Sequence, residues 1–264
     1  MTSRLAAHLT TWKAWYAIFA VPAFMLASLV VIGGPLLTPV SFLLFAFLGL
    51  LFIALASRRW PSSADLALRR GLTRRDLLII GVAWAVSHAL FWALGRGAGS
   101  QTGRAEQLFS EMGLDGPLLP AAVGLLSAVV LAPVCEEILF RGTMLRPIHD
   151  AFARRGKTWW GVALGILAST VVFAMPHLAE DSLNRMTLAY LITGVSFGLV
   201  YVLTGSMTAA MIAHSLQSVT AFAQVLWFGH GDTTVHPVLW ALVITSPVIV
   251  YLSAQLLRKI LPQR

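Results

Sequence analysis

Two neighbouring glutamates lie inside an otherwise apolar part of the chain. Residues 133–142 read Pro-Val-Cys-Glu-Glu-Ile-Leu-Phe-Arg-Gly, which places Glu136, Glu137 and Arg141 within six residues. A charged side chain at membrane depth costs about 2.5 to 3.5 kcal/mol on insertion scales, so it usually has a partner or a function. Glu137 and Arg141 are four residues apart on one helix face, with the acid first, which favours an ion pair. Glu136 is turned about 100° away and has no local cation, so we expect its carboxylate to face a cavity and exchange a proton.

Two later apolar runs also contain polar groups. Phe173-Ala-Met-Pro-His177 ends the run at 159–176, and His214 with Ser218 lies inside the run at 207–228. His214 and Ser218 are four residues apart and therefore share a helix face. Each residue alone is equally well explained by a hydrogen bond to a neighbouring helix. Together with a glutamate that has no local partner, they form a candidate catalytic set.

At these residues the chain resembles the CAAX prenyl protease and bacteriocin-processing family of intramembrane endopeptidases, also called CPBP or ABI. The family pattern is Glu-Glu-xxx-Arg, then Phe-xxx-His, then His-xxx-Asn or similar. The matching residues are Glu136, Glu137 and Arg141; Phe173 and His177; and His214 and Ser218. The resemblance covers about residues 117–220. It departs at Ser218, where prenyl-protein members carry Asn, and a hydroxyl reaches less far than a carboxamide. The departure bears on the prenylated substrate more than on catalysis.

The resemblance implies hydrolysis of a peptide bond in a membrane-associated or lipidated protein. Such hydrolysis needs a nucleophilic water, a base that activates it and donors for the developing oxyanion. By resemblance, Glu136 is the base, His177 orients the same water, and His214 with Ser218 donates to the oxyanion. The supporting residues are then the structural ion pair Glu137 and Arg141, and Phe173.

Other interpretations of the same residues remain open. Two histidines and a glutamate are a known catalytic zinc set, and the ligands would be Glu136, His177 and His214. The His-Glu-x-x-His helix signature is absent, and a glutamate-activated water explains the set without a metal. We therefore expect no cofactor, with zinc as the alternative. Buried Glu and His also occur in proton-coupled transporters, and a non-catalytic membrane partner is a further alternative.

The composition places all of these residues in a membrane protein. Of 264 residues, 58% are hydrophobic and only 11% are charged, which is far from the soluble globular average. We expect an all-α polytopic membrane helical bundle of about eight transmembrane helices, forming a single integral membrane domain over 1–264 with 117–228 as its catalytic core. Runs near the 20 or so residues that span a bilayer lie at 14–33, 37–56, 77–95, 117–140, 159–176, 187–203, 207–228 and 237–257.

The basic residues predict the orientation of the bundle. If the N-terminus is cytoplasmic, only Arg96, Arg104 and Arg185 of the 19 Lys and Arg residues fall on the outer side. This asymmetry predicts a multi-pass protein of the cell membrane with both termini in the cytoplasm. It also accounts for the excess of basic residues without nucleic acid. The expected partners are the lipid bilayer and a membrane-associated peptide or protein substrate.

The proposed catalytic residues must lie at one depth. If the fourth helix ended with its apolar run, Glu136 and His177 would lie near opposite membrane faces. Glu136 is 20 residues before Gly156, however, and His177 is 21 residues after it. Two antiparallel helices joined by a turn at Gly156 therefore bring them level. We predict that residues 142–154 continue the fourth helix, with a kink near Pro147.

Overall fold

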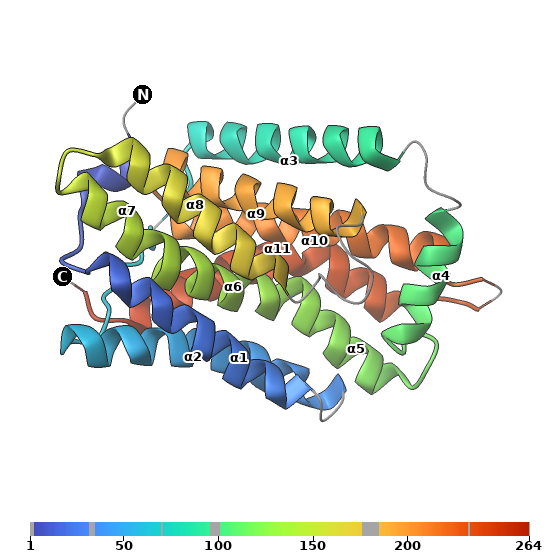
Figure 1. Ribbon diagram of the computed structural model, residues 1–264. Coiled ribbons are helices and arrows are strands. Elements are labelled where there is room, and N and C mark those ends of the chain that lie inside the picture. Colours follow the sequence, from blue (N-terminus) through green and yellow to red (C-terminus); the bar gives the residue numbers. More distant parts are fainter. Residues whose placement is uncertain are drawn as a thin grey trace.

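The computed structural model describes residues 3–31, 35–69, 71–95, 101–175, 185–231 and 233–263. Within these ranges the chain forms helices joined by turns and irregular segments, with no β-strand. The helices run largely alongside one another, and the two ends of the chain lie at the same end of the bundle (Figure 1). The predicted all-α polytopic membrane bundle is confirmed.

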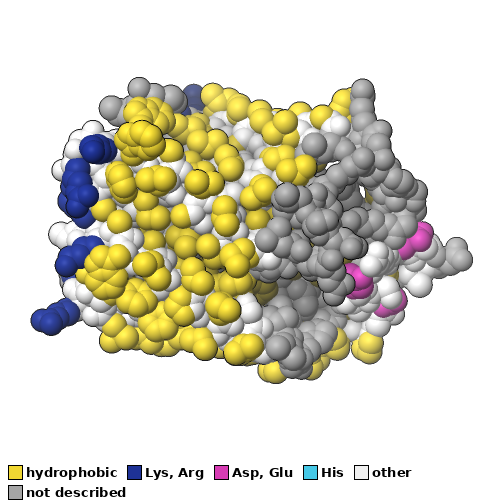
Figure 2. Space-filling model, viewed as in Figure 1, with side chains coloured by type: hydrophobic (Ala, Val, Ile, Leu, Met, Phe, Trp, Pro, Cys, Tyr) yellow, Lys and Arg dark blue, Asp and Glu magenta, His cyan; other side chains and the backbone are white. Residues whose placement is uncertain are grey.

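The helices match the predicted apolar runs. Five helical segments in the described residues are long and apolar enough to cross a membrane: Thr38–Ser57, Arg74–Ala93, Leu118–Ala153, Met207–Phe228 and Pro237–Ile260. Three shorter apolar helices, Ala14–Val30, Thr158–Ala174 and Leu188–Thr204, lie on the remaining runs. Hydrophobic side chains cover much of the bundle's flank, and Lys and Arg gather at one end (Figure 2). The protein is therefore a membrane protein, while the count of eight crossings stays a prediction.

The helical elements follow one another closely along the chain. Three short 3₁₀ helices, η1 to η3, lie near the N-terminus, and η4 and η5 are π-helical. In chain order the elements are η1 (Arg4–Ala7), η2 (Ala14–Phe19), α1 (Ala20–Val31), η3 (Pro35–Leu37), α2 (Thr38–Ser57), α3 (Arg74–Gly95), α4 (Gln101–Glu111), α5 (Leu118–Leu126), η4 (Ser127–Leu131), α6 (Ala132–Glu137), η5 (Ile138–Leu145), α7 (Arg146–Ala153), α8 (Thr158–Ala174), α9 (Arg185–Thr204), α10 (Met207–Phe228) and α11 (Pro237–Ile260).

A single long helix, Leu118–Ala153, contains both glutamates. Its π-helical turns η4 and η5 each end just before a segment with a proline near its start, Pro133 in α6 and Pro147 in α7. Proline has no backbone N–H, so the regular α-helical ladder is interrupted there, and single π turns often accommodate such interruptions. The prediction that the helix continues beyond the apolar run is confirmed through Ala153.

The continued helix contains two buried arginines. Arg141 and Arg146, which the sequence analysis counted among the basic segments at the cytoplasmic face, lie within the candidate span Leu118–Ala153. Both side chains are almost completely buried. The apolar run ended at residue 140 because hydropathy counts every arginine as a solvated charge, whereas these two are neutralised inside the protein by Glu137 and Asp150.

Glycines bring the central helices close together. The turn between α7 and α8 passes through Gly156, whose φ of 71° is the left-handed conformation that glycine adopts without strain. A Cβ at Gly161 of α8 would lie only 2.7 Å from the His149 backbone oxygen, and one at Gly165 only 3.1 Å from the Leu145 oxygen. A Cβ at Gly194 of α9 would lie 2.9 Å from Thr170 of α8. These small residues permit the close helix contacts that their spacing indicates.

Gly161→Ala is expected to destabilise the protein by about 1 to 3 kcal/mol, because the new methyl group would overlap a backbone oxygen that cannot rotate away. The matched control is Gly81→Ala in α3, where a Cβ would meet nothing within 4 Å. Alanine is about 1 kcal/mol better than glycine in a helix interior, so the control should be neutral or stabilising. Thermal unfolding of both variants in one detergent tests this. Equal unfolding midpoints would show that α7 and α8 are not packed so closely.

Candidate active site

The carboxylate of Glu137 is shared between two partners at the centre of the bundle. Its Oε1 lies 3.1 Å from Nη1 of Arg141, one turn along the same long helix. The same oxygen lies 2.9 Å from Nδ1 of His214 on α10. The side chains of Glu137 and Arg141 are 0% exposed. A buried charge pair of this kind needs good geometry and further hydrogen bonds to offset its desolvation. The bond from His214 supplies one of these. Oε2 of Glu137 and both Nε and Nη1 of Arg141 have no hydrogen-bond partner among the described residues.

Arg141 extends this contact to the neighbouring helices. Its Nη2 donates to the backbone oxygen of Gly194 in α9 at 2.8 Å. The guanidinium carbon lies 5.3 Å from the ring centre of Phe173 in α8 and 5.5 Å from that of Phe197 in α9. Aromatic faces attract cations at such distances, more strongly when water is excluded. Arg141 therefore ties α8 and α9 to the long helix.

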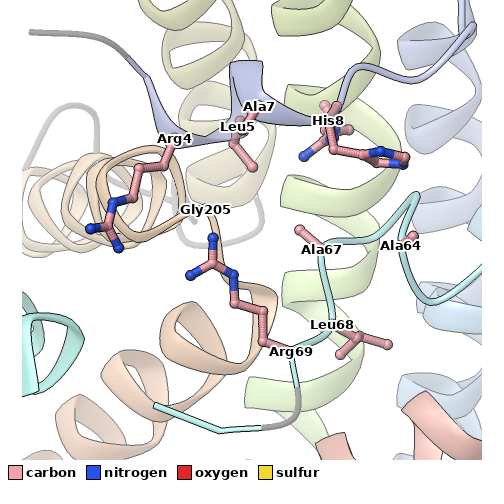
Figure 3. Close-up of a pocket in the computed structure, with 10 residues that line it drawn as sticks. Arg4, Leu5, Ala7, His8, Ala64, Ala67, Leu68, Arg69 and Gly205 are labelled. Atoms are coloured by element: carbon pink, nitrogen blue, oxygen red, sulfur yellow. The ribbon is translucent and has the colours of Figure 1, made fainter. Parts of the chain in front are cut away.

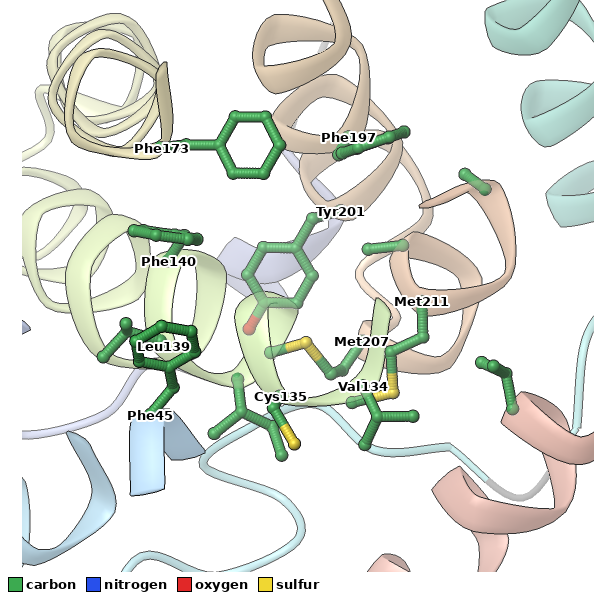
Figure 4. Close-up of a cluster of buried hydrophobic side chains, with 14 of the residues drawn as sticks. Phe45, Val134, Cys135, Leu139, Phe140, Phe173, Phe197, Tyr201, Met207 and Met211 are labelled. Carbon is green, nitrogen blue, oxygen red and sulfur yellow. The ribbon is translucent and has the colours of Figure 1, made fainter. Parts of the chain in front are cut away.

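The imidazole of His214 is held from several sides. Its ring stacks on Phe197 with ring centres 4.4 Å apart and 17° between the planes, and it meets Phe173 edge-on at 6.0 Å. The rings of Phe140, Phe173, Phe197 and Tyr201 gather in the space between these helices (Figure 4). With Nδ1 directed at Glu137, the opposite nitrogen, Nε2, lies 3.9 Å from Oε2 of Glu136. The two glutamates thus contact opposite edges of one imidazole.

The two glutamates differ in accessibility. The Glu136 side chain is 17% exposed and that of His214 is 10% exposed, whereas Glu137 is completely enclosed. A small molecule or a peptide group reaches the Glu136 carboxylate and the Nε2 edge of the imidazole more readily than Glu137. This accessibility agrees with the separate roles that the sequence suggested for the two glutamates.

The hydrogen bond to Glu137 restricts the protonation state of His214. An ionised carboxylate only accepts, so Nδ1 must carry the proton of this contact. In a neutral ring Nε2 then has a lone pair and can only accept. Nε2 can donate to an oxyanion only when the imidazole is charged. The oxyanion role expected for His214 therefore requires the doubly protonated ring.

The remaining predicted residues lie on the same helices or outside the described part of the chain. Ser218 is one turn beyond His214 on α10 and is half-buried, and its hydroxyl makes no hydrogen bond to any other described residue. Phe173 is buried against Arg141 and His214. His177 falls in 176–184, outside the described residues, so its predicted position beside Glu136 stays a prediction. Because Phe173 reaches Arg141, the end of α8 lies beside the site.

Two contributors to the site from α9 were not predicted from the sequence. The Phe197 ring stacks on His214, and the Gly194 backbone oxygen accepts from Arg141. Phe197 lies in an ordinary apolar run and carries no distinguishing signal. Gly194 belongs to a small-xxx-small pair with Gly198, which indicates close helix packing but not a bond to a buried arginine.

The zinc alternative depends on a residue outside the described ranges. No group of three or more His, Cys, Asp or Glu that could hold a metal ion occurs among the described residues. Glu136 and His214 present an oxygen and a nitrogen to the same space, and these would be two of the three protein ligands of a catalytic zinc site. His177 would have to supply the third.

Part of the chain is similar to a known family of endopeptidases. Residues 118–220 match the family model described as type II CAAX prenyl endopeptidase Rce1-like. The match covers less than half of the chain, and it confirms the resemblance to the CAAX prenyl protease (CPBP) family drawn from its motifs. An Escherichia coli protein described as an uncharacterized 24.3 kDa protein is 27% identical over 171 residues, covering 62% of this chain and 70% of that protein. No solved structure matches the chain significantly.

Glu137→Ala is expected to destabilise the protein by about 3 to 5 kcal/mol, because it removes one partner of a buried ion pair and leaves Arg141 without a counter-charge. Unfolding midpoints in one detergent measure the effect. Glu106→Ala on α4 is the control, since Glu106 is exposed and surface substitutions usually change stability by less than about 0.5 kcal/mol.

A double variant, Glu137→Leu with Arg141→Met, separates the charge from the packing. Removing both charges should recover part of the stability lost in Glu137→Ala, since replacing both members of a buried pair is often neutral. The recovery stays incomplete because Nδ1 of His214 and the Gly194 oxygen each lose a partner. If Glu137→Ala and the exposed control unfold alike, the buried pair does not hold the site together.

Proposed function

We propose that the protein is an intramembrane endopeptidase that hydrolyses a peptide bond of a membrane-associated or lipidated protein, using a water activated by Glu136. One observation carries the proposal. The Glu136 carboxylate and Nε2 of His214, from two different helices, face each other at 3.9 Å inside the bundle. His214 is fixed in this direction by Glu137, which is itself paired with Arg141.

The separation of the two groups suits a shared reactant. At 3.9 Å the carboxylate oxygen and the imidazole nitrogen are too far apart for a direct hydrogen bond. An oxygen atom about 2.8 Å from each would see them at an angle of about 90°, which is acceptable for a water or a tetrahedral intermediate. The pair can therefore act together on one small group.

The proposed reaction moves one proton through Glu136. Glu136 accepts a proton from the water as the water oxygen attacks the peptide carbonyl carbon. Negative charge develops on the carbonyl oxygen, to which the charged His214 and the Ser218 hydroxyl donate. The carbon–nitrogen bond then breaks, and Glu136 returns the proton to the departing amine. His177 is proposed to orient the attacking water.

The position of the site supports a substrate that enters the membrane. Glu136 lies 18 residues after the start and 17 before the end of the candidate span Leu118–Ala153, so it is near the middle of that helix. The peptide to be cut must reach this depth. A lipid anchor or an apolar segment would hold the substrate there, because its burial in the bilayer is favourable.

Glu136→Gln is expected to lower kcat for cleavage by about 10²- to 10⁴-fold, the usual contribution of a general base. His177→Ala should cause a comparable loss. The measurement is cleavage of a panel of lipidated and unmodified membrane-anchored peptides by purified protein in liposomes. Glu106→Gln, an exposed glutamate on α4, is the matched control and should keep full activity. Cleavage by Glu136→Gln at the control rate would rule out the proposed base.

Dialysis against a strong chelator in the same assay distinguishes the water-activating glutamate from a zinc enzyme. We expect activity to survive, because the proposed steps use protein groups alone. Activity that is lost to the chelator and restored by zinc would instead assign Glu136, His177 and His214 as ligands.

A further inference from the structure

A cavity of ≈ 190 Å³ lies at the basic end of the bundle, away from the glutamates. Its walls come from the N-terminal segment around η1, the connector between α2 and α3, the long helix at Arg146 and the α9–α10 turn at Gly205. Arg4, His8 and Arg69 surround it in Figure 3. Drug-sized ligands usually occupy at least about 300 Å³, so this cavity suits a small group.

The N-terminal wall of the cavity is firmly attached to the bundle. The backbone N–H and the hydroxyl of Thr10 both donate to Oδ2 of Asp150 at 2.8 Å. Arg146 donates through Nε to the same oxygen at 2.8 Å and through Nη2 to the backbone oxygen of His8. Arg154 also donates to the backbone oxygen of Thr10. The cavity is therefore preformed.

The cavity has an excess of positive charge. Its lining contains three arginines and a histidine, and no acidic residue. Arg146 is paired with Asp150, and Arg4 lies 3.8 Å from Asp76. Arg69 forms no ion pair within the described ranges, and its guanidinium extends towards Gly205 (Figure 3). One full positive charge thus faces the cavity without a counter-ion from the described residues.

The cavity lies at the depth expected for phosphate groups of the membrane. Trp60, Trp159 and Trp160 at this end are 37%, 61% and 64% exposed, and tryptophans concentrate at the level of lipid headgroups. The Lys and Arg side chains seen in Figure 2 gather at this end, whereas the visible Asp and Glu side chains lie at the other. Basic pockets between helices near a membrane face commonly bind anionic headgroups.

We propose that this cavity binds a phosphate group, with Arg69 as its principal ligand. The guanidinium presents several N–H donors in a plane and binds phosphate oxygens with two parallel hydrogen bonds. The phosphate belongs either to an anionic phospholipid headgroup or to free phosphate, which present the same chemistry to Arg69. The proposal does not depend on the peptidase assignment, because the cavity shares no residue with the candidate active site.

The test measures binding of phosphatidylglycerol, phosphatidylcholine and inorganic phosphate to the full-length protein in a neutral detergent, by native mass spectrometry with titration. Arg69→Gln should weaken phosphatidylglycerol binding about fivefold, the usual effect of one arginine near an anionic membrane surface. The Arg69 backbone oxygen, which accepts from Gln255 at 3.1 Å, is unaffected by the change. Arg155→Gln removes the same charge from the exposed turn after α7, outside the cavity, and should bind like the wild type.

The results separate the two sources of phosphate. If the protein binds phosphatidylglycerol but not inorganic phosphate, and Arg69→Gln weakens this binding, the cavity is a lipid site. If the protein binds inorganic phosphate and Arg69→Gln weakens that binding, the cavity is a free-anion site. His8→Glu, which adds a negative charge on an exposed side chain of the cavity, should weaken binding in the same way if Arg69→Gln fails to fold. Equal loss in Arg69→Gln and Arg155→Gln, or no binding of either anion by the wild type, would overturn the proposal.

Discussion

The Glu137 carboxylate joins the helices that form the candidate site. It is shared by Arg141 on its own helix and His214 on α10, and Arg141 in turn reaches the Gly194 backbone of α9. In a medium without water such charges are stable only when paired and hydrogen-bonded, so the position of each group depends on the others. This one carboxylate therefore fixes the direction of the His214 ring and places its Nε2 opposite Glu136.

Much of the fold was predicted from the lengths of the apolar runs and from residue distances along the chain. The apolar runs indicated the helices, and the equal distances from Gly156 predicted the extension of the long helix, because rise per residue is constant in a helix. The burial of Arg141 could not be read from hydropathy. A scale assigns each residue type one value, whereas the cost of burying an arginine depends on partners from other helices, here the Gly194 oxygen and two aromatic rings.

Within the site, local spacing indicated the Glu137–Arg141 pair but not the bond from His214 to Glu137. Four-residue spacing defines neighbours on one helix, while contacts between helices depend on packing that spacing does not encode. Because α10 packs against the long helix, Glu137 has a second role. Its carboxylate determines which nitrogen of the His214 ring carries the proton. Ser218 differs, because its shared face with His214 was evident from the sequence, whereas the partner proposed for its hydroxyl is a substrate.

We infer that Glu137 holds the Nδ1 proton of His214 and turns Nε2 towards Glu136. Nitrogen NMR of protein labelled at its seven histidines tests it, with the His214 signals assigned by their loss in His214→Gln. When the ring is neutral, we expect its proton on Nδ1 and none on Nε2. A neutral His214 ring with its proton on Nε2 would contradict it.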